Sequence, residues 1–188
     1  MKWILGALEE LLPVLAFFGI QSWYGFTAGA AAMVCTMFGL LLLVALRGRQ
    51  VPMFAAVSTV LVLLFVIPTV ITGNPMWFQL SDTVLDGGFA VILLASWWLK
   101  YPLLKKFFGR IFAITDEAWH TLSLRWGTLF LVLAISNEYI RIFYSQDIWS
   151  VYKLLSTIGI LLFGCYQFVL SAKMRIKGES NWLGLRMK

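Results

Sequence analysis

Long apolar runs alternate with short polar or basic loops along most of this chain. Five of these runs are long enough, or nearly so, to cross a bilayer, and four of them contain few or no charged residues. They cover residues 23–46, 52–71, 82–99, 119–143 and 148–172. An α-helix rises about 1.5 Å per residue, so about 20 apolar residues are enough to cross a hydrocarbon core of about 30 Å. The pattern therefore predicts an all-α fold, a polytopic membrane helix bundle with five transmembrane spans.

The N-terminal segment, residues 3–21, is apolar except where acidic residues interrupt it. Glu9 and Glu10 stand inside the apolar stretch, and Pro13 follows them. Three interpretations stay open: an amphipathic helix at the interface, a re-entrant helix that dips into the membrane, or a sixth span. Carboxylates are costly at membrane depth unless they are protonated or paired, which favours the interfacial or dipping helix.

Composition supports a membrane protein, and the basic residues predict its orientation. The chain has 188 residues, 61% hydrophobic and 13% charged, whereas soluble domains carry about a quarter charged residues. We expect one membrane domain, residues 1–188, with loop 72–81 outside and the C-terminal tail 173–188 in the cytoplasm. Basic residues favour the cytoplasmic side, and twelve of the 15 fall on one side of the predicted spans: Arg47, Arg49, Lys100, Lys105, Lys106, Arg110, Arg125, Lys173, Arg175, Lys177, Arg186 and Lys188.

Polar and charged residues gather near the outer ends of three predicted spans. Glu138 and Arg141 are three residues apart on one predicted helix, so their side chains are neighbours. Charges at this depth are expected to face the bundle and to pair, Glu138 with Arg141 or Lys153. The cluster can form an outward-facing pocket for a lipid head group or a partner, or an ion-pair network that holds helices together, which we favour. Its predicted members are Asp82, Asp86, Asn137, Glu138, Arg141 and Lys153.

The loop after the third span has the pattern of an amphipathic helix. From residue 102 onward, apolar residues follow helical spacing on one face, and basic residues occupy the other. This composition predicts a helix that rests on an anionic leaflet. A positive-inside topology signal is favoured over a site for one specific lipid, and the basic tail is interpreted in the same way. The predicted anionic lipid surface comprises Lys100, Lys105, Lys106 and Arg110.

Small and aromatic residues also carry predictions. Gly25 and Gly29 are four residues apart, a spacing at which two helix backbones can approach closely. This packing motif serves either contacts inside the monomer or a homodimer, and both alternatives stay open. Aromatic residues near the span ends, Trp119 and Trp149 among them, predict a belt at the membrane interfaces.

Residue types that carry catalysis or bind metals do not form a recognisable motif. His120 is the single histidine, and Cys35 and Cys165 lie inside different predicted spans, without the spacing of a metal site or a disulfide framework. No metalloprotease, serine-hydrolase or phosphate-binding motif is found. We therefore expect no catalytic residue, no cofactor and no metal, and a protein that is not an enzyme.

The order of several motifs along residues 11–170 resembles one known family, intracellular septation protein A (YciB) of Gram-negative inner membranes. The chain departs from the family where a Phe-Ile-Lys-x-Lys stretch usually enters the third span, because residues 77–81 hold no lysine. The matching motifs are Leu12-Pro13 followed by Phe17-Phe18, Lys100-x-Pro102-Leu103 ahead of Phe108-Gly109, Trp119-x-x-Leu122-x-x-x-Trp126, Asn137-x-x-Ile140 and Trp149-x-x-Tyr152-Lys153.

The resemblance implies a multi-pass protein of the bacterial inner membrane that supports cell envelope integrity, membrane homeostasis and septation. Its implied partners are membrane lipids and membrane proteins of division and wall elongation. Nucleic acid is excluded despite the net charge of +6, because the basic residues flank apolar spans. The alternative is a small transporter or lipid-translocating protein, and an intramembrane enzyme is a third. A transporter needs a water-filled cavity around Glu138 and Lys153, whereas a scaffold has a dry, paired network there.

Overall fold

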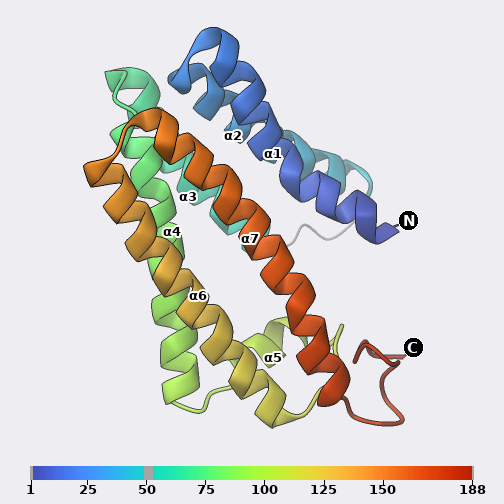
Figure 1. The fold of residues 1–188 in the computed structure, drawn as a ribbon. Coiled ribbons are helices and arrows are strands. Elements are labelled where there is room, and N and C mark those ends of the chain that lie inside the picture. Colours follow the sequence, from blue (N-terminus) through green and yellow to red (C-terminus); the bar gives the residue numbers. More distant parts are fainter. Residues whose placement is uncertain (1, 49–52, 188) are drawn as a thin grey trace. The chain divides into compact units, whose positions relative to one another are not determined.

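Seven α-helices follow one another along the part of the chain that the structure describes (Figure 1). This structure is a computed structural model that describes residues 2–48 and 53–187, and the side chains of residues 11–48, 56–57 and 59–187. The predictions for Arg49, Lys188 and the side chains of Glu9 and Glu10 fall outside this part. The helices are α1 (Lys2–Tyr24), α2 (Phe26–Leu46), α3 (Met53–Thr72), α4 (Met76–Trp98), α5 (Leu103–Phe108), α6 (Asp116–Phe143) and α7 (Gln146–Lys173).

Four described helices are long and apolar enough to cross a membrane, namely α2, α4, α6 and α7. They correspond to four of the five predicted spans. The remaining predicted span coincides with α3, whose described apolar segment is Thr59–Thr72, and α1 has a similar segment, Leu11–Tyr24. Large apolar side chains such as Leu64, Ile135 and Leu162 are exposed on these helices, as expected for surfaces that face lipid. The predicted all-α membrane bundle is confirmed.

Side-chain caps explain why two helices begin ahead of the predicted third and fourth spans. Before α4, the Oδ1 of Asn74 accepts a hydrogen bond from the backbone N–H of Met76 at 2.9 Å. Before α6, the Oγ1 of Thr115 accepts from the N–H of Ala118 at 3.3 Å. Such acceptors satisfy N–H groups that have no partner in the first turn of a helix. Asp116 then adds a negative charge at the positive end of the α6 dipole.

The helices form two compact units. Unit 1 consists of Met1–Leu85 and Ser136–Thr157, and unit 2 consists of Asp86–Ile135 and Ile158–Lys188. Unit 1 therefore contains α1, α2 and α3, whereas α5 belongs to unit 2. Each of α4, α6 and α7 contributes one part to each unit.

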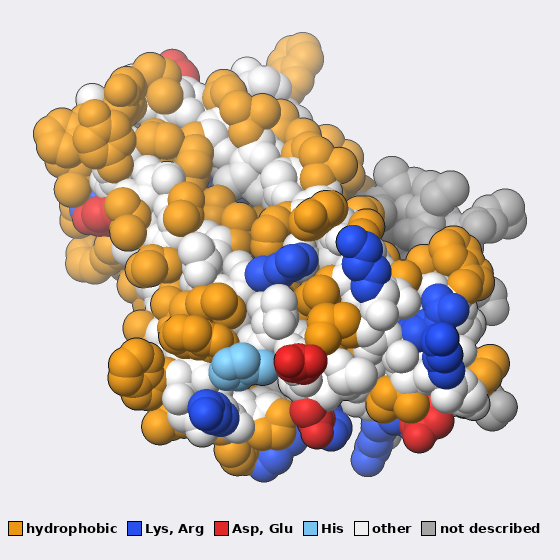
Figure 2. Space-filling model, turned by 60° about the horizontal axis from the view of Figure 1, so that its bottom comes forward, with side chains coloured by type: hydrophobic (Ala, Val, Ile, Leu, Met, Phe, Trp, Pro, Cys, Tyr) orange, Lys and Arg blue, Asp and Glu red, His pale blue; other side chains and the backbone are white. Residues whose placement is uncertain are grey.

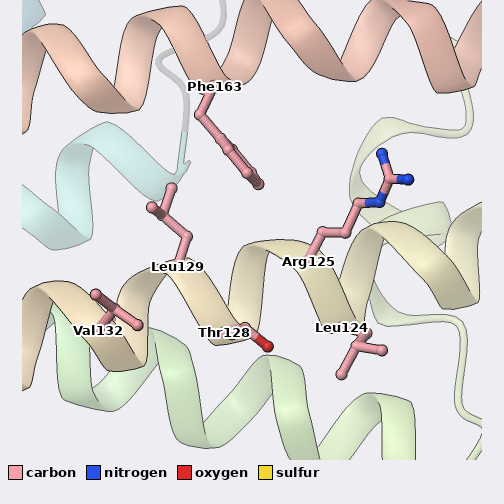
Figure 3. A pocket seen from close by; sticks show the side chains of 6 residues that line it. All are labelled: Leu124, Arg125, Thr128, Leu129, Val132 and Phe163. Carbon is pink, nitrogen blue, oxygen red and sulfur yellow. The ribbon is translucent and has the colours of Figure 1, made fainter.

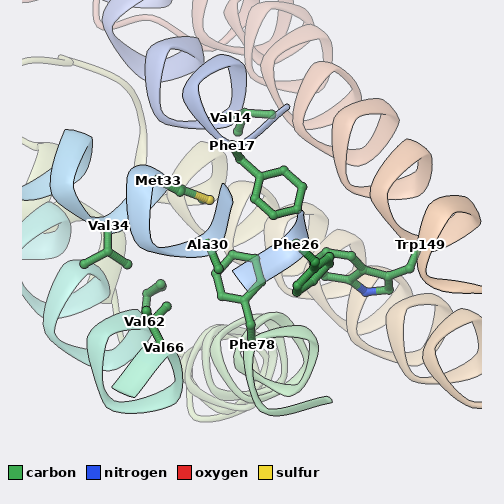
Figure 4. Packing of buried hydrophobic residues seen from close by; sticks show 10 residues of the cluster. All are labelled: Val14, Phe17, Phe26, Ala30, Met33, Val34, Val62, Val66, Phe78 and Trp149. Atoms are coloured by element: carbon green, nitrogen blue, oxygen red, sulfur yellow. The ribbon is translucent and has the colours of Figure 1, made fainter. Parts of the chain in front are cut away.

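Four aromatic side chains form the centre of unit 1 (Figure 4). Phe17 of α1, Phe26 of α2, Phe78 of α4 and Trp149 of α7 are all buried. Phe17 meets Phe26 edge to face with ring centroids 5.3 Å apart, and it stacks on Phe78 at 5.6 Å. The ring of Trp149 lies 5.6 Å from that of Phe26 and 5.8 Å from that of Phe78. Each aromatic pair adds about 0.5–1.5 kcal/mol beyond the burial of its area, so the cluster ties four helices together.

Glycine brings α1 and α2 side by side in unit 1 (Figure 1). Gly25 has a φ of +84°, which permits the abrupt turn between the two helices. A Cβ atom added to Gly29 would lie 2.8 Å from the carbonyl oxygen of Phe17 and 2.9 Å from the Cβ of Gln21. A larger residue would therefore push against the backbone of α1. Gly29 thus serves packing inside the monomer, one of the two alternatives that its spacing left open.

The C-terminal tail folds back on unit 2 and pairs with the segment that precedes α6. The N–H of Ala113 donates to the carbonyl of Gly184 at 2.9 Å, and the N–H of Ile176 donates to the carbonyl of Ala113 at 2.9 Å. The N–H of Arg186 donates to the carbonyl of Ile111 at 2.8 Å. Charge and aromatic content alone suggested a basic tail resting on lipid. The structure adds backbone pairing that such a pattern does not predict.

Candidate functional site

Asn137 lies at the centre of a hydrogen-bonded group in unit 1, and its side chain is fully buried. Its Nδ2 donates to the carbonyl of Gln79 at 2.9 Å and to the Oγ1 of Thr83 at 2.8 Å. Its Oδ1 accepts from the Nε1 of Trp149 at 2.7 Å. One amide of α6 therefore binds both α4 and α7. A buried polar group without partners costs about 1–3 kcal/mol, and these bonds avoid that penalty.

Glu138 and Arg141 form an ion pair on the same helix. The Nε of Arg141 donates to the Oε2 of Glu138 at 3.0 Å, and its Nη2 donates to the Oε1. The hydroxyl of Thr83 also donates to this Oε2, at 3.1 Å. Since Thr83 accepts from Asn137 as well, it connects the amide group to the ion pair. Of the two partners predicted for Glu138, the structure selects Arg141.

Lys153 of α7 is buried and pairs with Asp82 of α4. Its Nζ lies 2.5 Å from the Oδ2 of Asp82, and the two side chains are 8% and 20% exposed. The same Nζ lies 5.3 Å from the ring centroid of Phe78 and 5.4 Å from that of Trp149. Aromatic faces attract cations by about 0.5–2 kcal/mol. A carboxylate and two rings thus compensate for the loss of water around the ammonium group.

These contacts form one polar network that joins α4, α6 and α7 within unit 1. Five of the six predicted cluster residues belong to it, whereas Asp86 lies in the part of α4 that belongs to unit 2. Across the side chains that the structure describes, no buried nitrogen or oxygen lacks a hydrogen-bond partner. The members of the polar network are Gln79, Asp82, Thr83, Asn137, Glu138, Arg141, Trp149 and Lys153.

A second polar contact attaches α1 to the same part of α7. The Nε2 of Gln21 donates to the Oγ of Ser150 at 3.1 Å. The hydroxyl of Ser150 in turn donates to the backbone carbonyl of Gln146 at 3.0 Å. Ser150 directly follows Trp149, so the N-terminal helix is linked to the turn of α7 that also serves the polar network.

Sequence reasoning missed three members of the polar network: Gln79, Thr83 and Trp149. A signal for the first two was present, because they are four residues apart on an apolar helix and therefore share one face. Trp149 lies near the start of α7, as the belt prediction has it, and the structure adds that its ring is fully buried and its N–H is bonded to Asn137. Trp119 is buried as well, with 3% of the residue exposed.

The predicted anionic lipid surface lies in unit 2, where Figure 2 shows Lys and Arg side chains on one face together with acidic ones. The helix in this segment, α5, is shorter than residues 100–110, since it covers Leu103–Phe108 only. Lys100 and Arg110 flank it and are exposed. Phe107 is 55% exposed, so apolar and basic side chains both reach the surface here.

Two of these basic side chains have partners within unit 2. The Nζ of Lys105 lies 2.5 Å from the Oδ1 of Asp116, and both side chains are largely exposed. The Nζ of Lys106 donates to the hydroxyl of Tyr101 and lies over its ring, 4.3 Å from the centroid. Exposed pairs of this kind contribute about 0–1 kcal/mol. They orient the basic groups without neutralising the surface strongly.

Metal-ligating residue types are scattered. Within residues 2–48 and 53–187, no group of three or more His, Cys, Asp or Glu residues is placed to hold a metal ion. Cys35 and Cys165 are free and exposed. His120 stacks on Trp97, with ring centroids 5.7 Å apart. Among the described residues, we therefore take the polar network, with its buried hydrogen bonds and two ion pairs, as the candidate functional site.

Comparisons with known proteins identify relatives over most of the chain. The family model described as "Intracellular septation protein A" matches residues 5–177. The chain is 31% identical over 157 residues to "Inner membrane-spanning protein YciB" of Yersinia enterocolitica serotype O:8 / biotype 1B, covering 82% of this chain and 87% of that protein. It is 30% identical over 156 residues, with the same coverage, to the proteins of that name from Yersinia pestis (strain Pestoides F) and Yersinia pseudotuberculosis serotype O:1b. No solved structure matches the chain.

The names of these relatives describe proteins that span the inner membrane, and the family description refers to septation. Neither description names an enzyme. The resemblance found in the ordered motifs is confirmed. Because the family model covers most of the chain and the relatives are at least 30% identical over most of their length, the chain belongs to the intracellular septation protein A family of inner membrane-spanning proteins.

Proposed function

We propose that this protein is a non-enzymatic inner-membrane factor that supports cell envelope integrity, membrane homeostasis and septation through protein and lipid contacts. The family supports the process, and the pairing within the polar network supports the non-enzymatic role. Glu138 is paired with Arg141, and Asp82 with Lys153. The pair of Asp82 and Lys153 joins α4 to α7, and Glu138 is bonded to α4 through Thr83. Charged groups that already have such partners hold helices together, whereas a transport or catalytic cycle requires groups that exchange partners.

The alternative is a small transporter or lipid-translocating protein that uses the same charged groups. In that case Glu138 and Lys153 would line a hydrated path, and their charges would be indispensable. In a scaffold the charges matter only through the stability of the helix packing. A variant in which both members of a pair are neutral separates the two roles, because it removes the charges while leaving no buried charge without a partner.

The function is tested in the native host after deletion of the gene. We expect the intact chain to restore cell length, septum placement and resistance to detergent. The double variant Asp82→Asn, Lys153→Met should restore them nearly as well at equal protein level, because a scaffold does not use the charges themselves. Normal growth and division of the deletion strain would contradict the proposed process. Failure of the double variant at normal protein level would favour the transporter.

We also propose that the C-terminus is cytoplasmic and that the loop around Asn74 is outside, because twelve of the 15 basic residues favour this orientation. Single cysteines at Asn74 and Glu179, in a chain with Cys35→Ala and Cys165→Ala, test the orientation with an impermeant thiol reagent on intact spheroplasts. Labelling is expected at position 74 alone, and at both positions after lysis. Labelling at position 179 alone before lysis would reverse the topology.

The proposed partners are membrane lipids and membrane proteins of division and wall elongation, with a homodimer as a further proposal. The exposed basic residues beside α5, Lys100 and Arg110 among them, support the lipid contacts. Each basic residue near an anionic leaflet contributes about 1 kcal/mol of attraction. This surface would hold the loop against the leaflet without selecting a particular lipid.

A further inference from the structure

Arg125 is a cation inside a candidate span, and the described residues include no carboxylate that forms an ion pair with it. It lies nine residues after the first residue of α6, which corresponds to about 13 Å along the helix axis. Arg141, in the last turn of α6, and Lys153 of α7 each have an acidic partner. A charge at membrane depth is costly unless it is compensated. Arg125 therefore lacks the compensation that the other two receive.

The surroundings of Arg125 orient it without neutralising it. Its Nη1 donates to the Oε1 of Gln167 at 3.2 Å, and its guanidinium lies 5.9 Å from the ring centroid of Tyr166. Gln167 is buried, and its Nε2 donates to the backbone carbonyl of Phe163 at 3.2 Å. A guanidinium has five N–H donors, and a single hydrogen bond to protein uses one of them. The other N–H donors of Arg125 can therefore bind a ligand.

An open, mostly apolar groove of about 360 Å³ in unit 2 has Arg125 among its lining residues (Figure 3). Figure 3 shows Phe163 reaching from α7 towards α6, with Arg125 and Val132 at opposite ends of the labelled set. Val132 is seven residues beyond Arg125, so the apolar part extends about 10 Å along α6. A cationic end and an apolar body match the two parts of a lipid. The lining residues are Leu124, Arg125, Thr128, Leu129, Val132 and Phe163.

We propose that this groove binds one anionic phospholipid, with its phosphate on Arg125 and an acyl chain between Leu129, Val132 and Phe163. Charge complementarity identifies the occupant, because a phospholipid of net charge −1 neutralises Arg125, for which the described residues supply no carboxylate, whereas a zwitterionic lipid brings its own cation. The planar guanidinium fork suits two hydrogen bonds to phosphate oxygens. The proposal deepens the lipid contacts of the proposed function and names a specific site, whose lining residues differ from those of the basic surface beside α5.

The binding is measured by native mass spectrometry of the purified full chain in detergent, titrated with dioleoylphosphatidylglycerol or dioleoylphosphatidylcholine. One phosphatidylglycerol should bind per chain, in preference to phosphatidylcholine. Arg125→Gln should weaken this binding about tenfold or more, a change of about 1.4 kcal/mol. Val132→Trp should weaken the binding of both lipids, because the larger side chain would fill the groove. The control variant Lys105→Gln, Lys106→Gln, Arg110→Gln should bind one phosphatidylglycerol as tightly as the intact chain, because its substitutions are not among the residues that line the groove.

Unchanged phosphatidylglycerol affinity in both Arg125→Gln and Val132→Trp would overturn the proposal, as would equal affinity of the intact chain for the two lipids. Arg125→Lys keeps the positive charge but loses the planar guanidinium. Its affinity for phosphatidylglycerol should therefore lie between those of the intact chain and Arg125→Gln. If Arg125→Gln does not fold, Val132→Trp and Arg125→Lys decide the outcome, with thermal unfolding as the control for folding. Because the titration uses purified protein, its failure would leave the division test of the proposed function unaffected.

Discussion

Changing Lys153 to methionine alone should destabilise the protein by about 3 kcal/mol, whereas combining it with Asp82→Asn should recover most of this loss. The single change leaves a carboxylate that is only 20% exposed without its cation, and breaking a buried pair costs about 3–5 kcal/mol. Asp82 retains some exposure, so the lower end of this range is expected. The double change removes both charges and their desolvation cost together.

A double-mutant cycle in detergent micelles measures this coupling, with unfolding by sodium dodecyl sulfate followed by circular dichroism. The matched control is the exposed pair of Lys105 and Asp116, for which Lys105→Met should cost less than about 1 kcal/mol. Additive effects at positions 82 and 153 would show that the two charges are not coupled. That result would remove the ion pair from the account of how α4 and α7 are held together.

Changing Asn137 to leucine should destabilise the protein by about 2–3 kcal/mol, because three hydrogen bonds are lost and the buried N–H of Trp149 loses its acceptor. Leucine has a similar volume, so the loss reports on polarity more than on packing. Trp149→Phe keeps most of the ring packing and removes the N–H donor. On its own it should cost about 1–2 kcal/mol.

The same unfolding measurement tests this second prediction, together with the double variant Asn137→Leu, Trp149→Phe. Because both changes break one shared bond, their combined cost should be smaller than the sum of the single costs. A loss below about 0.5 kcal/mol in Asn137→Leu would mean that water replaces the lost partners. Unit 1 would then contain a hydrated centre, as the transporter alternative requires.

Hydropathy predicted the spans well because the cost of exposing backbone polar groups to lipid leaves a long apolar run few alternatives to a helix. The three-residue spacing of Glu138 and Arg141 also predicted their contact, because helix geometry makes such side chains neighbours. The contact of Lys153 with Asp82 joins different helices, and it depends on which faces meet. Shared depth suggested that these charges would pair, but the choice of partner required the structure.

Tertiary packing decided contacts that the sequence pattern did not predict. Trp149 has the sequence position of an interfacial ring, yet Phe17, Phe26 and Phe78 surround it and Asn137 accepts its N–H. An indole ring is stable at a membrane interface because water or a head group there can accept a hydrogen bond from its N–H. A buried asparagine supplies the same partner, so the residue type alone cannot distinguish the two environments.

The folded tail determines how reporter fusions to this protein can be interpreted. A fusion that replaces the chain after residue 173 would remove the acceptor of the Ala113 N–H, at Gly184, and the acceptor of the Thr115 N–H, at Met174. It would also uncover Ile114, which is now 2% exposed. Such a reporter would be attached to a damaged unit 2 and would be prone to degradation or misinsertion. Tags placed beyond Met187 on a flexible linker keep these bonds, and orientation maps are better built from point substitutions in the full chain.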